Sequence, residues 1–378
     1  MLAACETQAA SEAVAACSEL IQLAKTDDQR MRARLKRVAL SSELQTVEED
    51  ASEILKQEPG NRTALFSRAT LRAVSTGQEE GALKDYAVLI ASNARDTEAL
   101  AGRAWLYSRL GRAAEMGADA DALLALDPSD IDGLRYGTEA AMRSKNLVRL
   151  KDLAGKAAMT YPGEPFGFTG MAAVKLEAGD HAGAIALSSR AIEISGGEPE
   201  AYRLRGLALL ATGKPDDASS DFSRALAAAP DRTDILLPRA EAFLAAGNNA
   251  RALEDAEGAL KEAPDTLRAR EIRSLALLGR GMTGPALAEA ADILAITPGN
   301  EAMLILRAEA RMANRDFEAA AKEASSAAEK LPNSAKAHAL LAARSIAHRN
   351  LARRRTRLPR QSRSNLRRWI TGARKPAF

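Results

Sequence analysis

Few residues of this 378-residue chain have the type and spacing that chemistry requires. A G-x-G-x-x-G string, typical of dinucleotide-binding loops, occurs at Gly279, Gly281 and Gly284. Such a loop needs a strand before it and a helix whose N-terminus meets the pyrophosphate. Here the string joins two stretches with helical periodicity, and its first glycine belongs to the preceding helix. We therefore predict a turn at this position and expect no cofactor.

The histidines and cysteines do not form a reactive cluster in the sequence. His181, His338 and His348 are far apart and lack partners at metal-ligand spacing. The two cysteines, Cys5 and Cys17, are interpreted most simply as unpaired small apolar residues on helices. The alternative is a disulfide in an exported protein. We expect no metal, no catalytic residue and no small-molecule substrate, and hence a protein that is not an enzyme.

Charge and hydropathy limit where the chain can reside. Residues 1–329 hold 39 Lys and Arg against 50 Asp and Glu, a net charge of −11, whereas no acid follows Lys330. No stretch approaches the ~18 uncharged apolar residues of a membrane span. The first residues lack the basic and apolar regions of a signal peptide, which favours a cytoplasmic protein as the sequence stands. A periplasmic or exported protein is the alternative if the N-terminus is truncated.

A strict period of 34 residues organises the chain. It is marked by six prolines and one glycine: Pro128, Pro162, Gly196, Pro230, Pro264, Pro298 and Pro332. Within residues 199–232, Tyr202 and Gly206 lie on a first helical face, and Ala218 and Phe222 on a second. The small residue lets two helices approach closely, and the proline ends the second helix. In period and pattern the chain resembles the tetratricopeptide repeat family, a helix–turn–helix array.

The resemblance implies an all-α fold, a right-handed solenoid of helical hairpins. We expect residues 1–27 to form a degenerate half-repeat and residues 28–352 to form about nine repeats plus a final first helix. Pro238 lies about a turn into a first helix, so we expect a distortion or a late helix start there. Gly196-Gly197 replaces the expected proline and predicts a softer joint near residues 193–200. Residues 353–378 are basic and read as a disordered tail, a contact for nucleic acid or an anionic surface, or the product of a shifted reading frame.

One departure from the family pattern predicts a salt bridge inside most hairpins. An arginine replaces the usual aliphatic residue before the small slot, and an acid follows 16 or 17 residues later. The predicted pairs are Arg34 with Asp50, Arg68 with Asp85, Arg103 with Asp119, Arg205 with Asp221, Arg239 with Asp255, Arg273 with Glu289, and Arg307 with Glu323. The two units without the arginine also lack the acid; they hold Gly137 with Leu153 and Met171 with Leu187. This joint presence or absence favours a bidentate pair between the two helices.

The resemblance also implies that first helices line a concave groove for a peptide or helix of a protein partner. The groove slots include Trp105, Arg109, Arg135, Glu139, Phe166, Arg203, Leu207, Glu241 and Leu275. They predict an aromatic and basic sector followed by a leucine-rich sector. Our preferred function is a non-enzymatic interaction scaffold. The alternatives are the regulatory part of a longer, truncated enzyme or sensor, and a nucleic-acid-associated or anionic-surface-associated protein that uses the basic tail.

Overall fold

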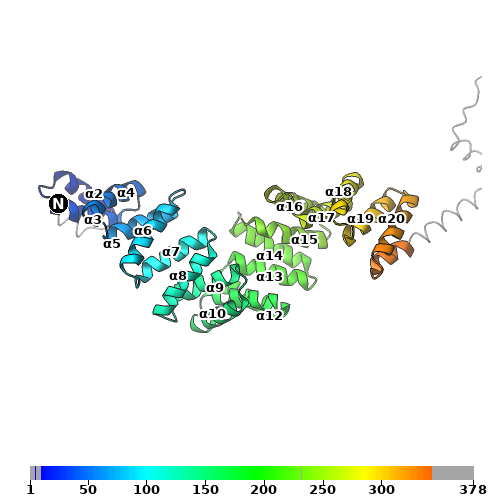
Figure 1. Ribbon diagram of the computed structural model, residues 1–378, viewed down its shortest axis with the longest axis horizontal. Coiled ribbons are helices and arrows are strands. Elements are labelled where there is room, and N and C mark those ends of the chain that lie inside the picture. The colour runs from blue at the N-terminus through cyan, green and yellow to red at the C-terminus, as the bar shows by residue number, and fades with distance from the viewer. Residues whose placement is uncertain (1–4, 6–9, 231, 343–378) are drawn as a thin grey trace, which may run out of the picture. The chain divides into compact units, whose positions relative to one another are not determined.

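The computed structural model describes residue 5 and residues 10–230 and 232–342, which form helical hairpins without any strand. The second helix of each hairpin is α4 (Leu44–Gln57), α6 (Glu79–Ser92), α8 (Ala113–Leu126), α10 (Leu147–Thr160), α12 (His181–Ser195), α14 (Pro215–Ala228), α16 (Asn249–Glu262), α18 (Thr283–Ile296) and α20 (Phe317–Lys330). The first helices are α3 (Asp27–Leu40), α5 (Arg62–Val74), α7 (Thr97–Arg109), α9 (Ile131–Arg143), α11 (Pro165–Glu177), α13 (Pro199–Ala211), α15 (Leu236–Ala245), α17 (Leu267–Gly279) and α19 (Glu301–Ala313). The predicted all-α solenoid of hairpins is confirmed (Figure 1).

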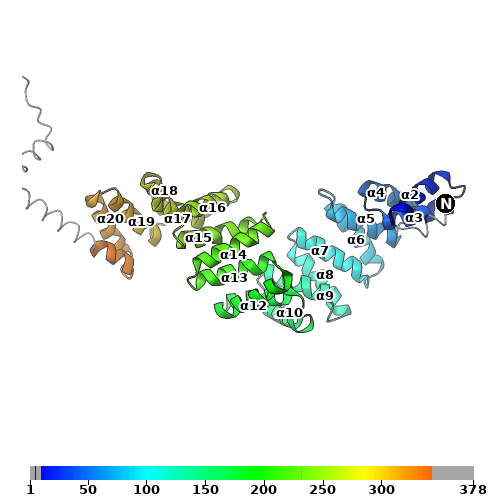
Figure 2. The ribbon, with the colours of Figure 1, turned by 180° about the vertical axis from the view of Figure 1, so that it is seen from behind.

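The chain divides into two compact units, residues 1–208 and 209–378. The boundary falls within α13, the helix that follows the irregular Gly196-Gly197 segment. Helices that are neighbours in sequence pack against each other, and successive first helices also contact one another from α3 to α11 and from α15 to α19, as α7 contacts α9 and α15 contacts α17 (Figures 1 and 2). First helices therefore crowd together on one side of each unit, and we call that side the inner face of the unit.

The turn inside each hairpin repeats one backbone feature. The second residue after the first helix, or the third after α5, has a positive φ; these residues are Gly77, Gly111, Lys145, Gly179, Gly213, Gly247, Gly281 and Arg315. Glycine adopts this left-handed conformation without steric cost, which explains why it fills six of these eight positions. Gly281 of the G-x-G-x-x-G string is one of them, and α17 ends at Gly279. The string is therefore a repeat turn between two helices.

Proline and cysteine define two local departures from the repeat. A short 3-10 helix, η1 (Thr233–Ile235), precedes α15, which begins late at Leu236 and places Pro238 in its first turn. At the N-terminal end, α2 (Ala10–Leu23) packs against α3. Its Cys17 is joined to Cys5 by a disulfide, and both cysteines are buried with Leu20. The structure therefore pairs two residues that were interpreted most simply as unpaired.

Ion pairs inside the hairpins have the bidentate geometry expected from the sequence. Arg103 donates from Nε and Nη2 to the two carboxylate oxygens of Asp119 at 2.9 and 2.6 Å. The corresponding contacts are 2.9 and 2.7 Å for Arg68 with Asp85, and both are 2.7 Å for Arg239 with Asp255. Arg273 with Glu289 and Arg307 with Glu323 are also hydrogen-bonded. Arg205 and Asp221 lie on opposite sides of the unit boundary, and their pairing stays a prediction.

The first hairpin departs from this pattern. Asp50 accepts its bidentate contact from Arg37 at 2.7 and 2.8 Å, whereas Arg34 approaches Asp50 only to 3.7 Å. The predicted salt bridge between Arg34 and Asp50 is therefore present, but the bidentate hydrogen bonding belongs to Arg37. Arg34 and Arg37 stand three residues apart on one face of α3, so both can reach the same acid. Arg37 also donates to Ser18 of α2, and this second contact favours Arg37 over Arg34 as the bidentate partner of Asp50.

The acids of these pairs are buried, so each carboxylate would be costly to desolvate without its arginine. Asp50, Asp85, Asp119 and Asp255 are 1–5% exposed, and Glu289 is 7% exposed. The hydrogen bond to Asp119 raises the pKa of Arg103, although burial opposes this shift. Where the pair is missing, apolar atoms fill its place: a Cβ added at Gly137 would lie 2.9 Å from Leu153 Cδ1. Met171 and Leu187 likewise pack against the core of their hairpin.

Changing Arg103 to Met should lower the free energy of unfolding by about 3–5 kcal/mol, because Asp119 would stay buried without its counter-charge. The double variant Arg103→Met/Asp119→Leu copies Met171 and Leu187 and should recover most of that loss. Hydrogen exchange in α7 and α8 measures the local effect. The control is Arg149→Met, whose partner Asp121 is 58% exposed, with an expected loss of about 0–1 kcal/mol. Equal losses in the single and double Arg103 variants would contradict this assignment.

Removal of the disulfide should loosen the N-terminal end alone. The bond closes a separation of 12 residues, and a loop of this size is worth about 3 kcal/mol. In the double variant Cys5→Ala/Cys17→Ala, hydrogen exchange should accelerate in α2 and remain unchanged beyond α5, because repeats contact only their neighbours. A thiol count on the denatured, unreduced protein should give no free cysteine. Two free thiols would show that the bond does not form.

Candidate partner-binding groove

The inner face of the first unit carries aromatic rings paired with arginines. The Arg109 guanidinium lies 5.0 Å from the centre of the Trp105 ring, one turn earlier on α7. Arg135 of α9 lies 5.4 Å from the Phe166 ring of α11, which belongs to the next hairpin. Trp105 and Phe166 are half-buried, whereas Arg109 is exposed. Part of each ring is therefore buried in the protein, and part remains accessible to a binding partner.

Two arginines of this face, Arg135 and Arg143, are held by acids, so the predicted basic sector is electrically mixed. Arg143 donates to Glu139 at 2.7 Å, and the Ser108 hydroxyl donates to the same carboxylate at 2.6 Å. Arg135 lies 3.5 Å from Asp132 and 3.6 Å from Glu164. The predicted aromatic and basic sector therefore also contains acids close to its arginines. The acids come from neighbouring turns and from the residue before the next first helix.

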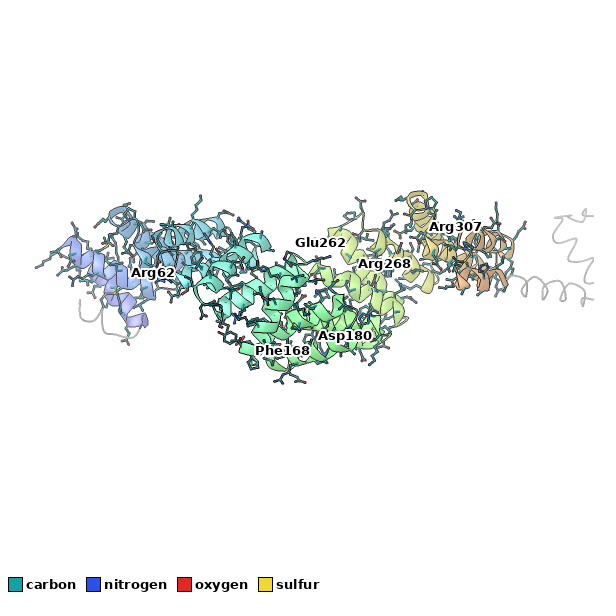
Figure 3. The ribbon with its side chains drawn as sticks, turned by 60° about the horizontal axis from the view of Figure 1, so that its bottom comes forward. Arg62, Phe168, Asp180, Glu262, Arg268 and Arg307 are labelled. Carbon is teal, nitrogen blue, oxygen red and sulfur yellow. A yellow bond between two sulfur atoms is a disulfide. The ribbon has the colours of Figure 1, made fainter. Side chains whose placement is uncertain are left out.

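Several of these contacts cross from one hairpin to the next. Arg109 donates to the backbone carbonyl of Ala73, at the end of α5. At the start of α5, Arg62 (Figure 3) donates to Asp96, the cap of α7, at 2.8 and 3.0 Å. Ser108 and Glu139 join α7 to α9 in the same way. The inner face is therefore held in place by contacts between repeats as well as within them.

Next to these pairs, a buried threonine contacts a half-buried glutamate, and sequence reasoning missed this contact. Thr169 of α11 is 2% exposed, and its Oγ1 lies 2.5 Å from a carboxylate oxygen of Glu198, the residue before α13. Burial raises the pKa of Glu198 above its ordinary value of 4.5, and the negative charges of Glu200 and Glu139 add to this shift. The sequence held a usable signal. Glu198 occupies the slot that Glu164 and Asn300 occupy in other units, and both of those contact the preceding first helix.

The remaining predicted groove residues are placed as follows. Arg203 of α13 forms hydrogen bonds of 2.6–3.1 Å to Glu200, and Leu207 is half-buried on the same helix. In the second unit Arg268 (Figure 3) donates to Glu241 at 2.7 Å and to Glu271 at 3.0 Å. Leu275 packs partly against the hydrophobic core of that unit, together with Leu237, Leu244 and Leu278. The predicted leucine-rich sector is therefore shared between groove surface and core.

The other residues singled out for chemistry do not assemble. No group of three or more His, Cys, Asp or Glu residues suited to a metal ion occurs in the described part of the chain. His181 begins α12, and the exposed His338 contacts the carbonyl of Pro332. His348 and the predicted tail of residues 353–378 lie outside the described residues. Within residues 10–230 and 232–342, no helix has the length and apolar character of a membrane span.

Comparison of sequences finds no relative, whereas comparison of structures finds several similar folds. No family model and no curated protein matches the sequence. Among solved structures, a tetratricopeptide repeat protein from Parabacteroides merdae is 18% identical over 70% of this chain and 99% of its own, with a TM-score of 0.49. The APC/C hetero-tetramer Cut9–Hcn1 matches over 91% of this chain and 68% of its own, at 12% identity and a TM-score of 0.49. YrrB, described as a protein with an unusual peptide-binding site, matches over 49% of this chain and 95% of its own, at 22% identity and a TM-score of 0.34.

Proposed function

Because the chain is built from hairpins of the tetratricopeptide type, we propose that it is a non-enzymatic scaffold whose first helices bind a peptide or helix of a protein partner. The observation that carries this proposal is the pairing of Trp105 with Arg109 and of Arg135 with Phe166 on the inner face of the first unit. Aromatic and arginine side chains supply most of the binding energy in protein interfaces. Both kinds are concentrated here, and each keeps a surface open to a partner.

The groove side chains are also held in place before any partner arrives. Two acids fix Arg135, and the ring of Phe166 lies beneath its guanidinium. Ser108 and Arg143 fix Glu139 in the same way. Side chains that are already ordered lose less conformational entropy on binding, which favours affinity. The alternation of acids and bases fits a partner segment that carries both charges and exposes backbone hydrogen-bonding groups.

We further propose that the protein works in an oxidising compartment, which corresponds to the exported alternative. The buried Cys5–Cys17 disulfide supports this proposal, because such bonds persist mainly in exported proteins. No observation in the described residues favours a regulatory part of a truncated enzyme. The nucleic-acid alternative depends on residues 353–378, which lie outside the described part of the chain.

The groove assignment predicts that Trp105→Ala/Arg135→Glu loses its partners. Partners captured by the full-length wild-type chain should fall at least tenfold with the double variant, because two central anchors are removed. Quantitative mass spectrometry of the captured proteins measures this loss. Circular dichroism should show unchanged helicity, since both residues lie partly at the surface.

The matched control is Arg190→Glu on α12. Arg190 is 56% exposed and is paired with an acid three residues away, as Arg135 is paired with Asp132, but it stands on a second helix. This variant should capture the same partners as the wild-type chain. If the double groove variant retains its partners, or if the control loses them equally, the groove does not bind them.

A further inference from the structure

The helix α10 (Figure 1) differs in charge from the other second helices. Among the second helices that the structure describes, α10 alone has a net positive charge, because Arg149, Lys151 and Lys156 outnumber its single acid, Asp152. The others have net charges between −3 and 0. Residues 1–329 as a whole have a net charge of −11. α10 is therefore a basic element within an acidic body.

α10 also exposes two large apolar side chains on one side. Val148 is 85% exposed and Met159 is 80% exposed, the highest values for any large apolar residue that the structure describes. Asp152 and Gly155 lie between them at the spacing i, i+4, i+7 and i+11, so the four residues form one stripe along the helix. The residues by which α10 packs into the core lie on the opposite side of the helix. We call Val148, Asp152, Gly155 and Met159 the outer stripe.

Bases without a counter-charge flank the outer stripe. Its spacing is that of the a and d positions of a heptad, and Lys151 and Lys156 then occupy the g and e positions on its two sides. Within the described part of the chain, neither lysine forms a salt bridge, and Asp152 forms none. Arg149, in contrast, donates to Asp121 of α8 at 3.0 Å. Both lysines therefore remain available to a charged partner.

Gly155 leaves space in the centre of the outer stripe. A Cβ added there would lie 3.9 Å from Met171 Sδ, an ordinary van der Waals distance, so the fold has room for an alanine. Glycine within a helix is less stable than alanine, because it loses more conformational entropy on folding. The packing of α10 therefore does not account for this glycine. A partner that places a side chain over position 155 does account for it.

We propose that the outer stripe of α10 binds an acidic amphipathic helix of a protein partner, at a site separate from the inner face. Apolar side chains of this partner helix cover Val148 and Met159 and enter the space over Gly155. Burial of that apolar surface drives the association. Acids on the two sides of the partner's apolar seam pair with Lys151 and Lys156, and such flanking charges decide which helices associate.

Two other occupants fit these residues less well. If α10 helices of two copies paired in parallel, Lys151 of one would face Lys156 of the other, and an antiparallel pair would bring each lysine to its own equivalent. Like charges meet in both arrangements, which disfavours self-association. An anionic membrane would meet the exposed carboxylate of Asp152 in the middle of the stripe. A partner helix avoids both conflicts if it places an uncharged polar residue opposite Asp152.

The test uses two fluorescent synthetic peptides of about three heptads with the same leucine seam, which an asparagine interrupts at its centre. One peptide has glutamate at the positions that flank the seam, and the other has lysine. Fluorescence anisotropy with the full-length chain measures both dissociation constants. The glutamate peptide should bind about tenfold more tightly, because attractive contacts with Lys151 and Lys156 become repulsive in the lysine peptide. Val148→Ser/Met159→Ser should lose this binding, and Lys151→Glu/Lys156→Glu should reverse the preference.

The matched control is Lys84→Glu/Val88→Ser on α6. Lys84 and Val88 are an exposed base and an exposed valine on a second helix whose net charge is −2. This variant should bind both peptides as the wild-type chain does. Gly155→Gln gives an independent test, because glutamine favours a helix yet fills the space over position 155. It should not lower the melting temperature, and it should weaken binding of the glutamate peptide by about fivefold.

Each remaining outcome overturns the proposal. Equal affinity for the two peptides, or no binding of the glutamate peptide, shows that α10 does not select an acidic helix. Binding that survives Val148→Ser/Met159→Ser places the peptide on other bases, such as those of residues 353–378. Binding that is lost in Trp105→Ala/Arg135→Glu places the peptide in the groove, so failure of the groove and failure of the α10 site are distinguishable.

Two further measurements test the other occupants with the same variants. One is cosedimentation with vesicles of equal parts phosphatidylglycerol and phosphatidylcholine, and the other is sedimentation equilibrium of the chain by itself. Neither vesicle binding nor dimer formation should depend on the outer stripe. Vesicle binding that Val148→Ser/Met159→Ser abolishes would assign α10 to a membrane, and a dimer that this variant dissociates would assign it to a second copy of the chain.

Discussion

The array depends on a buried acid of the second helix that is held by an arginine of the first. An isolated carboxylate at 1–5% exposure is expensive to desolvate, so Asp85, Asp119 and Asp255 require a counter-charge at one position of the facing helix. The planar guanidinium satisfies both carboxylate oxygens at once, and a helix shifted by one residue could not preserve both contacts. The pair therefore specifies the register of the hairpin more than it adds net stability. Gly137 with Leu153 and Met171 with Leu187 show the apolar solution to the same problem.

Register within hairpins decides how hairpins stack. In the first unit α7 contacts α9 and α9 contacts α11, and this crowding brings side chains from the three first helices onto one face. Charged groups there are exposed or half-buried, in contrast to the buried pairs between the two helices of a hairpin. Arg135 between Asp132 and Glu164 illustrates the difference. Such partly solvated pairs contribute little to stability, and they orient side chains that remain available to a partner.

Glu198 shows how a repeat position can acquire a separate property. In its slot, Glu164 has a base nearby and Asn300 is neutral, so neither places an uncompensated charge in the groove. Glu198 follows the two glycines that replace the repeat's proline, and it meets a threonine in place of an arginine. Irregular backbone and an acid without a base coincide in one link.

The sequence by itself determined the period, the helical hairpins and the slots at which arginines and acids occur together, because spacing along a helix specifies which face a residue occupies. It could not choose between Arg34 and Arg37 as the partner of Asp50, since both lie on that face. Only the tertiary structure decided that choice, the neutralisation of the groove arginines, the Cys5–Cys17 pairing and the Thr169–Glu198 contact. These contacts depend on how far each side chain is buried and on which residues of other hairpins lie beside it. The stacking of the hairpins sets both.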